Sequence, residues 1–255
     1  MTGVVRVGHK GADALVSGNT LASFERALEV GVEVIEFDVL PVGEKIMIAH
    51  DLHDAERPGV LTLDAVLEAF SRPPLDRVVF DCDIKARGAE PALVEGLRRH
   101  GLLPRAQVST SIPAVLTELR RLEPALERGW TLPHVTRDWT RTWWAKPAIP
   151  IALELGRRRL PSVVRQGQDE LRARNLWVFH PLITRRLVAT TRELGLRLIA
   201  WTVDDPTRIG ELVDLGVDGI VSNDPRLLSH LTGSTKTTPH PAAQGPSPAG
   251  RSLHR

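Results

Sequence analysis

Two histidines near the start of the chain each follow a short apolar run. His9 comes after "VVRVG", and His50, with Asp51 beside it, comes after "KIMIA". A histidine changes its charge near neutral pH, so two of them around one substrate can act as a general base and a general acid. The two histidines are therefore a candidate pair for proton transfer.

Three carboxylates follow two further β-rich runs. Glu36 and Asp38 are two positions apart, so a strand places both side chains on the same side. Asp83 and Lys85 repeat this spacing later in the chain. Three unpaired carboxylates close together are costly, and a hard cation such as Mg²⁺ or Ca²⁺ removes that cost because it binds carboxylate oxygens. The spacing predicts one divalent metal ion, with the Lys85 charge beside it for a phosphate.

The elements that must position these residues alternate between β-rich runs and helical patterns. We predict strands at 4–7, 34–39, 46–49, 78–84, 107–110, 128–132, 176–179, 197–203 and 219–221. Such alternation predicts a parallel sheet with the helices outside. About eight units in a chain of this length favour a closed TIM (β/α)8 barrel, with 46–49 as a small excursion after the second strand. The active site of such a barrel lies at the carboxyl ends of its strands, where the histidines and carboxylates fall.

The composition excludes several classes of protein. No apolar run approaches the roughly 18 residues of a membrane span. The chain enters its first strand without a charged and apolar leader, and Cys82 is its only cysteine, so we predict a cytoplasmic protein. The net charge is +2, and the last residues from Gly233 hold three basic residues and no acid. The rest of the chain is thus nearly neutral, and we predict no nucleic acid partner.

Two segments differ from the rest of the chain. Residues 233–255 are rich in Gly, Pro, Ser and Thr, so we predict a barrel domain over 1–232 and a disordered tail. Residues 137–168 hold many basic residues around an apolar run, with Trp139, Trp143 and Trp144 before it. One interpretation is an outer helix with a solvated basic face and tryptophans packed on the barrel. The other is a cap over the substrate, or a weak contact with an anionic lipid surface. For the three tryptophans we favour a wall of the pocket. The oligomeric state stays open.

Seven motifs follow one another in a fixed order along about 225 residues. They are "HKG" at 9–11, "GNT" at 18–20, "EFD" at 36–38, "HD" at 50–51, "DIK" at 83–85, "WTVD" at 201–204 and "GVDGIVSNDP" at 216–225. This series resembles that of the glycerophosphodiester phosphodiesterase family, whose pattern is HRG, ENT, ExD, HD, ExK, WTVN, and GVDGI followed by TDxP. The number and order of the motifs make a chance resemblance improbable.

The resemblance implies a TIM barrel, one divalent metal ion and hydrolysis of a glycerophosphodiester to glycerol 3-phosphate and an alcohol. It also implies roles by position. The metal ligands are Glu36, Asp38 and Asp83, and the acid/base pair is His9 and His50. Lys10 and Lys85 contact the phosphate, Trp201 contacts the glycerol, and Asn19 and Asp51 support the site. His180 ends a predicted strand and is a further candidate for substrate contact.

Three departures from the family pattern point to a divergent subgroup. Lys10 stands where the pattern has Arg, Gly18 where it has Glu, and Asp83 where it has a longer Glu. Lys10 keeps the charge but loses the two-pronged contact of a guanidinium with phosphate. The alternatives are a phosphodiesterase acting on lysophospholipids or related lipids, in the manner of a phospholipase D, and a non-catalytic ligand-binding barrel. Retention of both histidines and all three carboxylate positions favours an enzyme.

Overall fold

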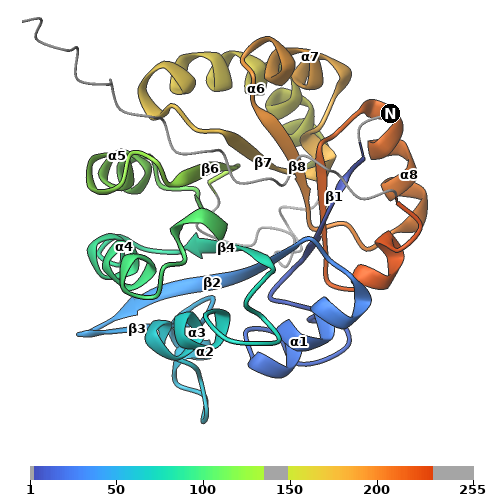
Figure 1. Ribbon diagram of the computed structural model, residues 1–255. Coiled ribbons are helices and arrows are strands. Elements are labelled where there is room, and N and C mark those ends of the chain that lie inside the picture. The colour runs from blue at the N-terminus through green and yellow to red at the C-terminus, as the bar shows by residue number, and fades with distance from the viewer. Residues whose placement is uncertain (1–2, 135–148, 232–255) are drawn as a thin grey trace, which may run out of the picture.

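Eight parallel strands close into a barrel in the computed structural model, which describes residues 3–134 and 149–231 (Figure 1). β1 pairs with both β2 and β9, so these strands form a ring without an open edge. The predicted TIM barrel is therefore confirmed. Its strands are β1 (Val5–Gly8), β2 (Val34–Val42), β4 (Val79–Ile84), β5 (Ala106–Thr110), β6 (Glu127–Leu132), β7 (Asn175–Phe179), β8 (Arg197–Trp201) and β9 (Gly219–Ser222).

The excursion after β2 is a hairpin and a short helix. β3 (Lys45–Met47) runs antiparallel to the end of β2. Gly43 makes the turn with a φ of 60°, a left-handed conformation that glycine adopts at little cost. Helix α2 (Leu52–Ala55) follows. His50 lies between β3 and α2, so the excursion returns the chain to the carboxyl end of the barrel at this residue.

Helices cover the outside of the barrel. Several begin at a threonine or aspartate whose side chain accepts an N–H of the first turn, as at Thr20, Thr62 and Asp205. Gly31 ends α1 and Gly216 ends α8, both with a left-handed backbone. The helices are α1 (Leu21–Val30), α3 (Leu63–Phe70), α4 (Glu90–Arg99), α5 (Pro113–Leu122), α6 (Ile149–Leu171), α7 (Arg185–Glu193) and α8 (Pro206–Leu215), with 3-10 turns η1 (Leu103–Arg105), η4 (His180–Leu182) and η5 (Pro225–Leu228).

Packing outside the barrel fixes which strand residues point into it. Four phenylalanine rings, from α1, β2, α3 and β4, form one fully buried cluster: Phe24, Phe37, Phe70 and Phe80. Burial of each such side chain contributes about 1.5–3 kcal/mol. Phe37 lies between Glu36 and Asp38 in the sequence. Because Phe37 packs outward, both carboxylates are turned into the barrel.

Of the two unusual segments of the sequence, the structure describes only part of 137–168. α6 covers 149–168 of this segment as a helix. Trp139, Trp143 and Trp144 lie outside the described residues, as does the predicted tail 233–255. None of the described helices is long and apolar enough to cross a membrane.

Candidate active site

A pocket of about 560 Å³ opens at the carboxyl ends of the barrel strands. One side of it comes from β1, β2, β4 and the excursion and carries most of the ionisable side chains: His9, Lys10, Glu36, His50, Asp83 and Lys85. The other side comes from β5 to β8 and is mostly neutral: Ser109, Ser111, Thr131, His134, Trp177 and Trp201. Charge and neutral polar groups therefore face each other across the pocket.

The three predicted metal ligands lie together. β2 and β4 pair in a register that sets Asp38 beside Asp83. One carboxylate oxygen from each of these residues and one from Glu36 lie within 4.8 Å of one another. Asp38 is fully buried, Glu36 nearly so, and Asp83 is partly exposed.

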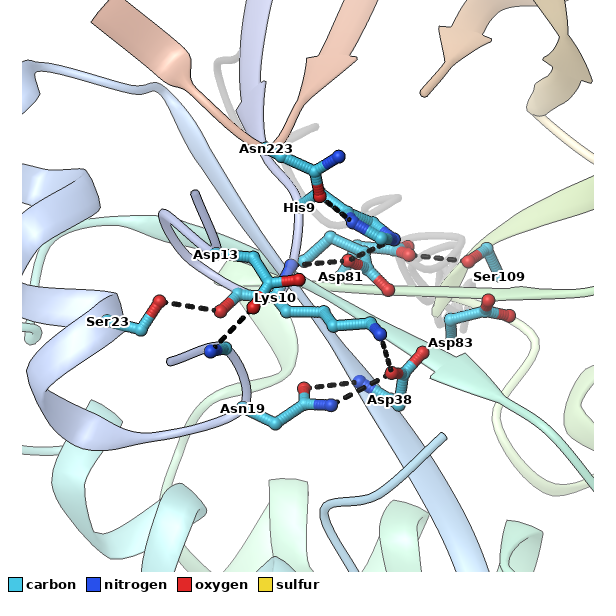
Figure 2. Close-up of polar contacts among 12 residues, drawn as sticks. His9, Lys10, Asp13, Asn19, Ser23, Asp38, Asp81, Asp83, Ser109 and Asn223 are labelled. Atoms are coloured by element: carbon cyan, nitrogen blue, oxygen red, sulfur yellow. Dashed lines mark hydrogen bonds and ion pairs between the residues drawn. The ribbon is translucent and has the colours of Figure 1, made fainter. Parts of the chain in front are cut away.

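Two lysines and an asparagine surround Asp38, and Figure 2 shows the contacts that Lys10 and Asn19 make with it. Lys85 Nζ lies 2.6 Å from Asp38 Oδ1, an ion pair that lacks hydrogen-bond geometry, and it also contacts Asp83. Lys10 Nζ lies 3.7 Å from Asp38 Oδ2, and Asn19 Nδ2 donates to the same oxygen at 2.9 Å. Burial alone would raise the pKa of Asp38, but Lys85 and Lys10 hold this pKa well below its usual value. Asp38 is therefore a charged carboxylate at any ordinary pH.

Glu36 has the opposite electrostatic environment. Burial, and then the charge of Asp38, raise the pKa of Glu36 to about 8. Its Oε2 accepts the Lys10 backbone N–H at 2.9 Å and lies 4.0 Å from His9 Nε2. A buried acid with such a raised pKa gains from any cation beside it. This carboxyl and the two neighbouring carboxylates form a set of hard oxygen donors, so the residues fit a divalent cation such as Mg²⁺ or Ca²⁺.

His9 is held by a short chain of hydrogen bonds. Its Nδ1 lies 2.6 Å from Asn223 Oδ1, while Asn223 Nδ2 donates to Asp204 Oδ2 at 2.6 Å. Because the amide nitrogen of Asn223 is committed to Asp204, its oxygen faces His9, so we assign the proton to Nδ1 and the free lone pair to Nε2. Burial lowers the pKa of His9. The ring is therefore a neutral base whose Nε2 lies towards Glu36.

Asn223 and Asp204 were not among the predicted site residues. Both lie inside motifs that carry the family resemblance, "WTVD" and "SNDP". The family pattern has Asn where this chain has Asp204, and Asp where this chain has Asn223. The amide and the carboxylate have thus changed places in this chain, and the structure shows them in contact. This reciprocal exchange of residue types is visible in the sequence and indicates that the two side chains are in contact.

His50 lies at the pocket on a more exposed segment. Its side chain is 53% exposed, and its Nδ1 is 3.8 Å from Asp51 Oδ2. The other oxygen of Asp51 accepts the Asp54 N–H at 2.9 Å and caps α2, which lowers the pKa of Asp51. Asp51 thus fixes the segment that carries His50.

The neutral side of the pocket presents polar groups without partners among the described residues. These are the indole N–H groups of Trp177 and Trp201 and the Thr131 hydroxyl. Trp177 lies over Gly129, where a Cβ would stand 2.4 Å from Nε1, so only glycine accommodates the indole. Of these residues only Trp201 was predicted. The others follow from the curvature of the barrel, which strand periodicity does not give.

The structure does not bring His180 to the pocket. β7 ends at Phe179, and the 3-10 turn η4 carries His180 towards α8. There Arg208 donates to His180 Nδ1 at 3.3 Å and to its carbonyl oxygen at 2.7 Å. Burial and the Arg208 charge lower the pKa of His180. Its predicted contact with substrate therefore has no support from its position.

The chain is similar to known proteins along most of its length. The sequence model of the glycerophosphoryl diester phosphodiesterase family matches residues 9–72 and 85–227. The glycerophosphodiester phosphodiesterase GDPD4 of Arabidopsis thaliana is 26% identical over 251 residues, which cover 90% of this chain and 73% of that protein. A glycerophosphodiester phosphodiesterase of Caldanaerobacter subterraneus is 24% identical over 259 residues, which cover 88% and 96%.

Two solved structures have a similar fold. A glycerophosphodiester phosphodiesterase from Parabacteroides distasonis has a TM-score of 0.68 and 19% identity, over 90% of this chain and 98% of that one. A phosphodiesterase from Oleispira antarctica in complex with the product sn-glycerol-3-phosphate has a TM-score of 0.67 and 19% identity, over 88% and 94%.

Proposed function

The chain belongs to the glycerophosphoryl diester phosphodiesterase family, and on that premise we propose that it hydrolyses glycerophosphodiesters to glycerol 3-phosphate and an alcohol, with one divalent metal ion. The observation that carries the proposal is the placement of two histidines and three carboxylates around one pocket. The names of the Arabidopsis and Caldanaerobacter relatives support the substrate class. The only cysteine, Cys82, is buried and free, which supports the predicted cytoplasmic location.

The proposed metal ligands are Glu36, Asp38 and Asp83. When bound, Mg²⁺ or Ca²⁺ would neutralise the charge on the phosphate oxygens. Lys85 and Lys10 add two further positive charges at the same side of the pocket. The pKa of Lys85 is raised: burial would lower it, but Asp38 and Asp83 outweigh burial. Lys85 therefore keeps its charge for a phosphate.

His9 and His50 divide the proton transfers in this proposal. His9 Nε2 takes the proton of the attacking oxygen as that oxygen bonds to phosphorus, because His9 is neutral and its tautomer is fixed. His50 protonates the alcohol oxygen as the bond between this oxygen and phosphorus breaks. The attacking oxygen belongs either to water or to a hydroxyl of the glycerol, which would give a cyclic phosphate first.

Release of glycerol 3-phosphate from glycerophosphocholine tests the proposal. The assay compares Mg²⁺, Ca²⁺ and a chelator, for the wild type, His9→Ala and His50→Ala. We expect metal-dependent release and a loss of about 100-fold or more in each variant. His230→Ala, at an exposed position, is the matched control. A folded protein that releases nothing with either metal would contradict this reaction and leave the lipid substrates below and the non-catalytic barrel.

Exposed apolar side chains favour lipid-linked substrates as a second candidate. Leu52, two residues after His50, is 62% exposed, and Ile151 and Leu155 of α6 are 65% and 47% exposed. This end of α6 lies at the carboxyl end of β7, because Arg157 donates to Pro181 O at 2.8 Å. Apolar groups beside the active-site face suit the acyl chain of a lysophospholipid, or a weak contact with a lipid surface.

A comparison of substrates separates the two candidates. If the lipid candidate holds, lysophosphatidylcholine should be cleaved to lysophosphatidate and choline, and Ile151→Glu with Leu155→Glu should slow this reaction alone. Val163→Glu is the control, because Val163 is also exposed on α6 but lies further along the helix. Equal effects on glycerophosphocholine and on the lipid would count against a lipid contact.

A further inference from the structure

The loop from Lys10 to Asn19 joins β1 to α1 and sends two side chains to Asp38 (Figure 2). Both residues have a left-handed backbone, with φ of 49° for Lys10 and 58° for Asn19. This conformation is uncommon for residues with a Cβ, although asparagine tolerates it better than lysine. Asn19 contacts Asp38 twice, since its Oδ1 also accepts the Asp38 N–H at 3.1 Å. The loop must therefore be held in shape for these contacts to persist.

Hydrogen bonds inside the loop hold this shape. The Asn19 N–H donates to the Lys10 carbonyl at 3.0 Å, and the Ser23 hydroxyl donates to the same carbonyl at 2.8 Å. Asp13 Oδ1 accepts the Gly18 N–H at 2.7 Å. The Asp13 carboxylate thus fixes the residue that immediately precedes Asn19.

Position 18 has no room for a side chain. A Cβ at Gly18 would stand 2.5 Å from Asp13 Oδ1 and 2.7 Å from Lys10 Cβ. The family pattern has a glutamate at this position, and its carboxylate is absent here. In this chain the carboxylate beside position 18 comes instead from Asp13, five residues earlier. The Asp13 carboxylate therefore occupies the space that a side chain at position 18 would need.

We propose that Asp13 is a positioning residue of the metal site. It fixes Gly18, and through the loop it holds Asn19 and Lys10 against Asp38. It takes the place of the carboxylate that the family pattern has at position 18, so the departure at Gly18 does not signal a lost site. This inference rests on the proposed metal-dependent function, and its test includes a measurement that needs no turnover.

The test is a titration of the purified protein with Mn²⁺, followed by electron paramagnetic resonance, alongside kcat and KM for glycerophosphocholine. Asp13→Ala should weaken Mn²⁺ binding by about tenfold, since support of metal ligands is worth that much or more. Asp13→Asn keeps an oxygen for the Gly18 N–H and should recover most of the affinity. Gly18→Ala should weaken binding as Asp13→Ala does. The controls are Asp169→Ala and Gly210→Ala, at an exposed position and at a glycine with open space around it.

The outcomes separate this inference from the proposed function. Wild-type affinity in Asp13→Ala, or a loss no larger than in Asp169→Ala, would overturn the role of Asp13. If Mn²⁺ binding falls as expected but the wild type releases no glycerol 3-phosphate, the role of Asp13 stands and the proposed reaction fails. If the wild type binds no Mn²⁺, both are wrong. A fall in kcat with little change in KM would place the effect on the metal site rather than on binding of the substrate.

Discussion

The basicity of His9 is controlled by residues more than 190 positions away in the sequence. Asp204 accepts the side-chain N–H of Asn223 at 2.6 Å and its backbone N–H at 2.8 Å. This leaves the Asn223 oxygen for the Nδ1 proton of His9. An amide in contact with the ring stabilises a protonated imidazole less than a carboxylate would. Because the amide of Asn223, and not the carboxylate of Asp204, contacts the ring, a neutral His9 is favoured.

A reciprocal exchange tests this order. Asp204→Asn leaves one acceptor oxygen where Asn223 uses two, so Asn223 loses a fixed orientation and kcat/KM should fall about tenfold. Asp204→Asn with Asn223→Asp restores the pair and places the carboxylate against His9, which raises the His9 pKa. The base must be neutral to act, so the acidic limb of the kcat/KM profile should move about one unit to higher pH. An unmoved limb in the double variant would contradict the assignment of His9 as the base.

Local spacing was sufficient to predict that the three carboxylates lie together, but not which groups contact His9 or line the far side of the pocket. Glu36, Asp38 and Asp83 could be predicted because two-residue periodicity turns them into the barrel and because β2 and β4 are neighbours. Asn223 directly follows β9, and Trp177 lies in β7, on other parts of the ring. Their contacts depend on barrel closure and on the path of an indole over Gly129, which a one-dimensional pattern does not contain.

Among the elements, the short helix α2 determines how firmly His50 is held. A helix of four residues gains little from packing, and none of its residues is buried. Its N-terminal cap is therefore a large share of its stability. Because His50 directly precedes the capping residue Asp51, loosening this helix loosens His50.

Removal of the cap should separate activity from stability. Asp51→Ala loses about 1 kcal/mol of local helix stability, so kcat should fall severalfold while the melting temperature hardly changes, since α2 lies outside the barrel ring. Asp51→Asn retains a capping oxygen and should recover most of the activity. Steady-state kinetics and thermal unfolding of the three proteins measure this. A large fall in melting temperature for Asp51→Ala would show that α2 supports the barrel as well.

Elements with regular periodicity could be predicted, and short irregular ones could not. The strand–helix alternation gave the eight strands because apolar runs in a parallel sheet are continuous. The antiparallel pairing of β3, the helix α2 and the turn η4 rest on a few residues each. The turn η4 affects the prediction of the site, because it places His180 against Arg208 and not at the pocket.

For the molecule as a whole, the stability of the barrel is linked to the charge of its site. Glu36 has a pKa of about 8 in the folded protein without metal, against about 4.3 in an unfolded chain. The folded state thus binds more protons than the unfolded state between these values, and stability falls as pH rises through that range. His9, whose pKa is lowered by burial, acts in the opposite direction, but only below about pH 6.5. Asp81, whose pKa burial raises, contributes with the same sign as Glu36.

The metal-free protein should therefore lose about 2 kcal/mol of unfolding free energy between pH 6.5 and 8, of which Glu36 contributes a large part. Urea unfolding in chelator, at several pH values, measures this loss. Glu36→Gln has no titrating proton at this position and should reduce the slope. Added Ca²⁺ should reduce it too, because a bound cation favours the charged carboxylate. Stability that rises with pH over this range in the metal-free wild type would contradict the raised pKa, and with it the argument that Glu36 gains from a cation.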